Sequence, residues 1–206
     1  EKERKDLGEP GDWVAENKWD GIRGQIIKRN DEVFIWSRGE ELVTEQFPEV
    51  VETVSQCQGN FVLDGEILPV KNGDILNFNE LQKRLNRKNV SKKMTEEIPI
   101  SIFVYDLLEW EFEDVRDKTF LERRQLLENE NNKNPFHSIQ LSTVIPFEKW
   151  DELSPIRESA REINSEGLML KNKHSVYHSG RVKGDWWKWK LNPLTMDAVL
   201  IYAQKG

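Results

Sequence analysis

Lysine, aspartate and arginine lie close together in the stretch AENKWDGIRG, residues 15–24, and this grouping could serve nucleophilic attack by Lys18. A lysine attacks only after its ammonium group has lost a proton, which nearby positive charge or removal from water favours. The sequence neighbours of Lys18 supply too little of either, so help must come from distant residues. The alternative is a β-hairpin in which Asp20 and Gly21 form the turn and Lys18 and Arg23 end two strands in water.

Charged residues also interrupt apolar segments that are predicted as strands. Burying a carboxylate in such a segment costs several kcal/mol unless the group is paired or binds a cation. A charge that recurs on strand after strand therefore indicates one polar cleft lined by a sheet. The polar residues in and beside these segments are Arg38, Asp64, Glu66, Tyr105, Asp106, Glu166 and Lys171.

The segment WWKWK, residues 186–190, alternates between aromatic and basic side chains. Because successive side chains of a strand point to opposite faces, Lys188 and Lys190 share one face, and Trp187 and Trp189 share the other. We expect the two tryptophans to lie in the core rather than to stack on a ligand.

Composition limits the class of protein. The 206 residues suit one large domain or two closely joined lobes, and eight Trp and nine Phe can build a core. The net charge of −7 argues against a general coat for nucleic acid, although basic runs at 83–93 and 181–190 could contact phosphates or simply be solvated. The single Cys57 fits a reducing compartment. Neither a signal peptide nor a membrane-spanning run occurs, so we expect a cytoplasmic protein, associated with the nucleoid if prokaryotic.

Periodicity and turn residues predict an α+β fold with mostly antiparallel sheets and helices on their outer faces. Thr119 and Glu122 form a capping box that begins one of the helices. Strands are predicted at 22–29, 32–38, 61–70, 98–108, 138–145, 167–171, 185–191 and 197–203. Helices are predicted at 44–57, 77–87, 119–129 and 147–164.

The run KWDGIR at 18–23 matches the K-x-D-G-x-R signature of covalent nucleotidyltransferases, which include ATP-dependent DNA ligases, RNA ligases and mRNA capping enzymes. The remaining motifs follow in the family's order from about Trp13 to the C-terminus. EGLMLK, 166–171, resembles the DNA ligase form, whereas capping enzymes usually carry an Asp-Gly-led form. The chain thus resembles the adenylation domain of an ATP-dependent DNA ligase, which implies two mostly antiparallel sheets flanked by helices in an ATP-grasp-like fold with a central nucleotide cleft.

This resemblance implies a reaction in three steps. Lys18 attacks the α-phosphate of ATP to give lysyl-AMP, the AMP passes to the 5′-phosphate of a DNA nick, and the 3′-hydroxyl then displaces it. Lys188 and Lys190 would supply positive charge at the α-phosphate and favour proton loss from Lys18. Mg²⁺ or Mn²⁺ is the expected metal, with Glu166 as its ligand, directly or through water.

The resemblance also assigns roles to the other motif residues. Glu16 corresponds to the acceptor of the adenine 6-amino group, and Tyr105 to the aromatic ring that stacks on adenine, where the family often has Phe. Glu66 and Arg38 would contact the ribose, with Arg38 also near the nick phosphate. Three further positions complete the expected site: Arg23 near the ribose or the phosphates, Asp20 orienting the loop or assisting the nucleophile, and Lys171 in the phosphate pocket.

The family normally carries an OB-fold domain after these motifs and, in longer ligases, a helical DNA-binding domain before them. We therefore expect residues 1–206 to be a monomeric adenylation domain cut from a larger enzyme, competent mainly for self-adenylation, with nicked duplex DNA and those domains as partners. An RNA ligase or a capping-type guanylyltransferase is the alternative, which preference for ATP or GTP would separate. A non-catalytic nucleotide-binding domain is a further alternative, against which Lys18 and the pair Lys188 and Lys190 argue.

Overall fold

Two mostly antiparallel sheets form in the part of the chain that the computed structural model describes, residues 7–87, 89–133, 139–180 and 182–192. The small sheet has the strand order β11-β10-β1-β9, and the large sheet has the order β3-β2-β4-β6-β7, with β5 beside β4 and β8 parallel to β6. The small sheet contains β1 (Trp13–Trp19), β9 (Val144–Ile145), β10 (Ser165–Asn172) and β11 (Trp186–Lys190). The large sheet contains β2 (Ile22–Arg29), β3 (Glu32–Ser37), β4 (Phe61–Lys71), β5 (Asp74–Ile75), β6 (Ile100–Trp110), β7 (Glu113–Asp114) and β8 (Ile139–Leu141).

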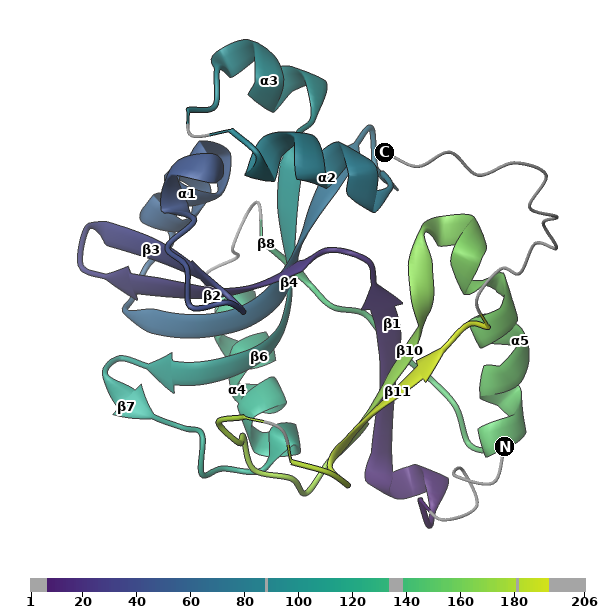
Figure 1. Ribbon diagram of the computed structural model, residues 1–206. Helices are drawn as coiled ribbons and strands as arrows, with labels where there is room; N and C mark the ends of the chain where they lie inside the picture. The colour runs from purple at the N-terminus through teal and green to yellow at the C-terminus, as the bar shows by residue number, and fades with distance from the viewer. Residues whose placement is uncertain (1–6, 88, 134–138, 181, 193–206) are drawn as a thin grey trace, which may run out of the picture.

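The backbone passes between the two sheets through short links. Asp20 and Gly21 carry the chain from β1 into β2, and Ser142 and Thr143 carry it back from β8 to β9. Figure 1 shows β1 beside β10 and β11, while β2 extends away into the other sheet. The hairpin alternative for Asp20 and Gly21 is therefore wrong, because β1 pairs with β9 and β10 instead of β2.

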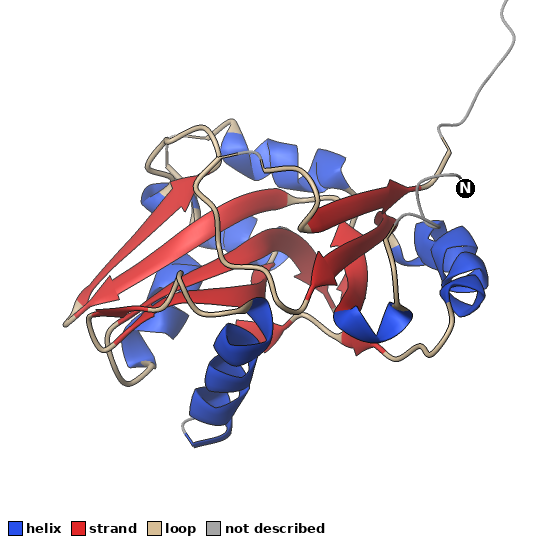
Figure 2. Cartoon of the chain, turned by 90° about the horizontal axis from the view of Figure 1, so that it is seen from below, coloured by secondary structure: helices blue, strands red, loops and turns tan. Residues whose placement is uncertain are grey.

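Helices cover the outer faces of the sheets (Figure 2). The α-helices α1, α2 and α4 pack on the large sheet, and α5 packs on the small one. The predicted capping box begins α4: the Thr119 hydroxyl accepts from the Glu122 amide at 3.3 Å, and the Glu122 carboxylate accepts from the Thr119 amide at 2.8 Å. No helix in the described ranges has the length and apolarity needed to cross a bilayer. The α-helices are α1 (Pro48–Gln56), α2 (Phe78–Leu85), α3 (Lys92–Glu97), α4 (Phe120–Lys133) and α5 (Leu153–Ser159), and the 3₁₀ helices are η2 (Pro10–Asp12), η3 (Thr44–Gln46), η4 (Trp150–Glu152) and η5 (Ala160–Ile163).

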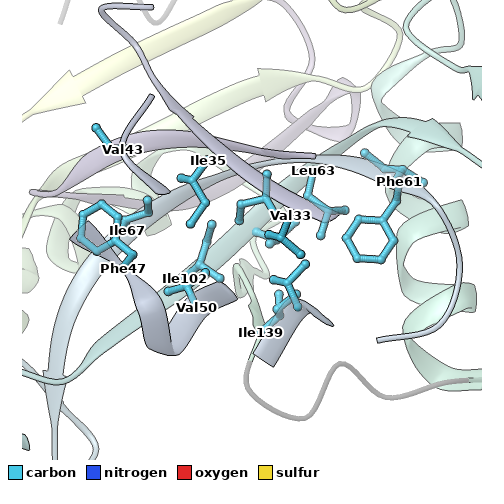
Figure 3. Packing of buried hydrophobic residues seen from close by; sticks show 14 of the residues in the cluster. Val33, Ile35, Val43, Phe47, Val50, Phe61, Leu63, Ile67, Ile102 and Ile139 are labelled. Atoms are coloured by element: carbon cyan, nitrogen blue, oxygen red, sulfur yellow. The ribbon is translucent and has the colours of Figure 1, made fainter. Parts of the chain in front are cut away.

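Each sheet has its own apolar core on the side away from the other sheet. In the large sheet, Phe47 and Val50 pack from the helical side against strand residues such as Ile35 and Ile67 (Figure 3). In the small sheet, the core forms around Trp13 and Leu153 and includes the partly buried Trp187 and Trp189. The prediction that these two tryptophans belong to the core is confirmed.

Several element boundaries differ from the prediction. The segment predicted as one strand at 138–145 forms two short strands in different sheets, because Ser142 and Thr143 turn the chain between them; residue 138 lies outside the described residues, as does the strand predicted at 197–203. The helix predicted at 147–164 is divided into η4, α5 and η5, and the helix predicted at 44–57 begins with η3 before Pro48 starts α1. The predicted elements did not include β1, α3 or β7.

Asp106 of β6 lies opposite Asp64 of β4, on the same face of the large sheet, but it does not line the cleft. Its carboxylate binds Arg123 of α4 through two hydrogen bonds of 2.8 Å, and both side chains are fully buried. Burial raises the pKa of the Asp106 carboxyl, and the Arg123 guanidinium opposes that rise. The ion pair thus fastens α4 to β6.

Replacing Asp106 with Ala should lower the free energy of unfolding by about 3–5 kcal/mol, because Arg123 would keep a buried charge without its partner. Chemical denaturation measures the loss. The matched control is Asp114→Ala, which breaks the exposed pair of Asp114 and Arg116 and should cost at most about 1 kcal/mol. Equal losses in the two variants would contradict a special role for the buried pair.

Candidate active site

A cleft of about 1270 Å³ lies between the two sheets, and every predicted site residue except Lys190 lines it. Lys190 instead reaches the cleft through a contact with Glu166. The lining residues that the sequence predicts are Glu16, Lys18, Asp20, Arg23, Arg38, Glu66, Tyr105, Glu166, Lys171 and Lys188. The predicted clustering of charged strand residues is therefore observed, although Asp64 and Asp106 are fully buried and do not line the cleft themselves.

Strand alternation explains how the large sheet presents charge to the cleft. On β2 and β4, Arg23 is paired in register with Glu66, and Gln25 with Asp64. The intervening positions carry residues such as Ile26, which point to the opposite face and join the apolar core. One face of each strand can thus be charged while the other is buried in hydrocarbon.

A β-bulge positions the predicted nucleophile. Between the paired residues Asn17 and Trp19 of β1, Lys18 lies opposite two residues of β10, Glu166 and Gly167. Such a bulge turns a side chain away from its regular direction, and here it brings the Glu166 carboxylate to Lys18. Lys18 Nζ donates a hydrogen bond to Glu166 Oε2.

The same carboxylate also binds a second lysine. Lys190 Nζ donates to Glu166 Oε1 at 3.2 Å, so Glu166 lies between two cations. Partial burial would raise the pKa of the Glu166 carboxyl, but hydrogen bonds and positive charge from Lys18 and Lys190 lower it overall. Lys188 lies on the same face of β11 and lines the cleft, as the alternation predicts.

Two glycines allow the close approaches around Lys18. Gly21 has no room for a side chain, since a Cβ atom there would lie 2.5 Å from the Ile67 carbonyl oxygen. Gly167 has a φ of +132°, and its Cβ would lie 2.3 Å from the Trp189 carbonyl oxygen. The backbone of β11 thus occupies the space that a side chain at residue 167 would need.

Lys171 lies deep in the cleft, on Glu16. Its Nζ donates to Glu16 Oε2 at 2.8 Å and lies 4.2 Å from the Tyr105 ring centre and 4.5 Å from that of Trp186. The rings form cation–π contacts with the buried ammonium group. The structure thus pairs Lys171 with the residue expected to read the base, whereas the sequence predicted it among the phosphate contacts. The difference arises from the register of the strands. Val14, Glu16 and Lys18 lie on the same face of β1, and Lys171 pairs with Val14, the member of this series that is farthest from Lys18.

A fully buried carboxylate, Asp64, joins three side chains of the site. It accepts two bonds from Arg23 Nε and one of 2.7 Å from Arg23 Nη2, together with hydroxyl bonds from Tyr105 at 3.2 Å and Tyr177 at 2.9 Å. Burial, followed by the charge of Asp64, raises the pKa of both tyrosines, so their hydroxyls stay protonated and donate. Arg23 loses solvation on burial, yet hydrogen bonding and charge from Asp64 raise its pKa overall.

Residues that line the cleft or bind its lining and that sequence reasoning missed include Ser142, Met169, Tyr177 and Trp186. Trp186 and Met169 could have been found from alternation, since they share the inward faces of β11 and β10 with Lys188 and Lys171. Tyr177 lies in the loop after β10, and no local sequence pattern predicts that this loop crosses the cleft.

Two further carboxyl groups have raised pKa values in the cleft. Burial raises the pKa of Glu66 to about 7, with Lys18 opposing the rise and Asp64 adding to it. Burial and then the charge of Glu166 raise the pKa of Asp20. Among the described residues, no group of three or more His, Cys, Asp or Glu side chains is gathered closely enough to hold a metal ion alone.

Comparison with known proteins identifies similar chains. The family model described as ATP dependent DNA ligase domain matches residues 3–190. A protein of Koribacter versatilis named probable DNA ligase is 35% identical over 214 residues, which cover 94% of this chain and 37% of that protein. The chain therefore spans little more than a third of this curated relative.

Solved structures share the fold. The ligase domain of M. tuberculosis LigD aligns with a TM-score of 0.69 at 22% identity, covering 86% of this chain and 54% of that one. The ATP-dependent DNA ligase of bacteriophage T7, solved in complex with ATP, aligns with a TM-score of 0.66 at 23% identity, covering 91% and 64% of the two chains. Both support the predicted α+β fold.

Replacing Glu66 with Gln should change the pH dependence of stability. Because burial raises the Glu66 pKa from 4.5 to about 7, the folded protein binds this proton more tightly than the unfolded chain. The resulting stabilisation is full below pH about 4.5 and is lost as the pH rises through about 7. Relative to the unmodified protein, the Gln variant should gain about 2 kcal/mol of unfolding free energy between pH 5 and pH 8.

Denaturant unfolding at the two pH values measures this gain, and Glu45→Gln, at an exposed position, gives the background. The raised pKa would be ruled out if the free energies of unfolding of Glu66→Gln and the unmodified protein differed by the same amount at both pH values.

Proposed function

The chain belongs to the ATP-dependent DNA ligase domain family, and we propose that it carries out the adenylation step of ligation with Lys18 as the nucleophile. The observation that carries the proposal is the position of Lys18, which lies on a bulge in the cleft with Glu166 and Lys190 on its far side. Phosphoryl transfer depends on placement and charge neutralisation, and this arrangement offers a nucleophile with cations beside it.

In the proposed step, the Lys18 amine forms a bond from Nζ to the α-phosphorus of ATP. The bond from that phosphorus to the oxygen bridging the β-phosphate breaks, and pyrophosphate leaves with the electron pair. One proton leaves Nζ before the attack and a second after it, which gives the neutral phosphoramidate nitrogen. Lys188 and Lys190 neutralise charge on the non-bridging oxygens.

Adenine selection is proposed for the inner end of the cleft. Glu16 is buried, and its Oε1 has no hydrogen-bond partner among the described residues. A buried acceptor without a donor suits the 6-amino group of adenine, whereas the guanine carbonyl would place one oxygen against another. Tyr105 offers the ring for stacking, with its hydroxyl held by Asp64. The base preference argues against a capping-type guanylyltransferase.

We propose Mg²⁺ or Mn²⁺ as the metal, with Glu166 as the ligand. Magnesium is commonly held by one or two carboxylates, waters and substrate phosphates, so the absence of a dense acidic cluster among the described residues is compatible with it. Burial is the main reason that the pKa values of Asp20 and Glu66 are raised, and the charge of Glu166 adds to both rises, a contribution that a bound cation would oppose. Bound there, a divalent cation would stabilise phosphate charge and weaken the hold of Glu166 on Lys18.

Nicked duplex DNA is the proposed recipient of the AMP group. The relative from Koribacter versatilis is named probable DNA ligase, and this chain matches 37% of it. We therefore assign adenylation to this chain and nick sealing to the longer polypeptide of which such a domain forms part. The basic segment of α2 and α3, with Lys83, Lys92 and Lys93 at exposed positions, would contact the phosphate backbone without reading sequence.

Incubation of the chain with ATP and Mg²⁺ should add the mass of one AMP, as a bond stable to alkali and labile to acid. Lys18→Ala should abolish the adduct while the protein still folds. Intact-mass spectrometry measures the adduct, circular dichroism checks the fold, and Lys173→Ala, at a partly exposed lysine just after β10, is the control. Undiminished labelling of folded Lys18→Ala would refute the assignment.

Glu166→Gln should slow adenylation by at least about tenfold, because the change keeps the shape of the side chain and removes its charge. If Glu166 binds the metal, the variant should also need more Mg²⁺ or Mn²⁺ to reach half its maximal rate. Rate measurements over a metal titration test both effects. A normal metal dependence in the variant would transfer the metal site to other groups, with Glu66 and Asp64 as the next candidates.

A further inference from the structure

We infer that Arg124 of α4 is a positioning residue for nucleotide selection, because its charge holds the Glu16 carboxylate in place at the inner end of the cleft. The inference rests on the proposed function, in which Glu16 accepts a hydrogen bond from adenine. Arg124 lies behind the cleft, outside the motifs that identified the other site residues, and it does not itself line the cleft.

The guanidinium group of Arg124 is fixed on two sides. Its Nε donates to Glu128 Oε1 at 2.6 Å, and its Nη2 donates to the carbonyl oxygen of Ser142 at 2.8 Å. The residue is 7% exposed, so solvent does not compete for these bonds. The third side of the group, Nη1, faces Glu16 Oε1 at 3.7 Å.

Glu16 is bound asymmetrically. Its Oε2 accepts from Lys171 Nζ at 2.8 Å and from Ser142 Oγ at 2.9 Å. Its Oε1 and the facing Nη1 of Arg124 are both buried, and neither has a hydrogen-bond partner among the described residues. An orphan acceptor therefore lies opposite an orphan donor, at a separation that gives charge attraction without a hydrogen bond.

This arrangement has a clear consequence for the carboxylate. The attraction of Arg124 holds Oε1 in place without a short bond that would use its lone pairs. Without Arg124, Lys171 and Ser142 would bind only Oε2, and the carboxylate could rotate about that anchored oxygen. Ser142 is shared, because its hydroxyl binds Glu16 and its carbonyl binds Arg124, so the link between β8 and β9 fixes the distance between the two charged groups.

Arg124→Met removes the charge and retains most of the side-chain length. We expect selectivity for ATP over purine riboside triphosphate, which lacks the 6-amino group, to fall by at least about fivefold in adenylation kcat/KM. Selectivity for ATP over GTP should fall in parallel. Arg124→Lys keeps a cation facing Glu16 and should restore part of both ratios. These ratios report on base contacts, so a general loss of stability would not change them.

The matched control is Arg84→Met, which removes another fully buried arginine, bound to Glu49 and to the carbonyl oxygens of Gln46 and Ile98. It should lose stability and keep the selectivity of the unmodified protein. Selectivity of folded Arg124→Met equal to that of the unmodified protein would overturn the inference, and if that variant does not fold, unchanged selectivity in Arg124→Lys and Arg124→Gln would do the same.

The outcomes separate the two levels of the argument. Absence of labelling by any nucleotide in the unmodified chain would overturn the proposed adenylation itself. Labelling without preference for ATP over purine riboside triphosphate would leave Lys18 as the nucleophile and overturn the roles given to Glu16 and Arg124.

Discussion

The arrangement of the cleft depends on one ion pair formed across a break in strand pairing. Where Lys18 lies opposite Glu166 and Gly167, the regular ladder would keep lysine and carboxylate apart, and the bulge brings them together. The bulge needs the positive φ of Gly167, and it also sets the register of β11, whose Lys190 returns to the same carboxylate. This bulge therefore brings the charges of Lys18, Glu166 and Lys190 together, and the regular strand pairing around it holds it in place.

Buried carboxylates in this protein are paired with cations from two kinds of element. Asp64 and Glu16 are held by Arg23 and Lys171, contributed by other strands. Asp106 is held by Arg123 of α4. All are expensive to bury, and pairing offsets most of that cost. A sequence cannot distinguish the two kinds, because each appears as a lone acid within an apolar strand.

Features that depend on neighbouring residues could be predicted from the sequence, whereas the pairing of distant strands and side chains could not. The hairpin of β2 and β3, the capping box of α4 and the two faces of β11 were correctly predicted, because each depends on residues within one or two turns of chain. The hairpin considered for Asp20 and Gly21 was wrong. The same residues can form a tight link between two strands of one sheet or between strands of two different sheets. The motif order brought the cleft residues together, although the contact of Lys171 with Glu16 became visible only with strands β1 and β10 in register.

The two links between the sheets have a mechanical consequence. In the described part of the chain, the backbone crosses at residues 20–21 and again at 142–143, and both crossings adjoin the site, beside Lys18 and at the Ser142 that binds Glu16. A line through the two crossings is the natural axis for any rocking of one sheet against the other. Groups near an axis move little, so Lys18 and Glu16 would keep their separation during such a motion. The cleft would then change its width at the rim without losing the alignment of these two residues.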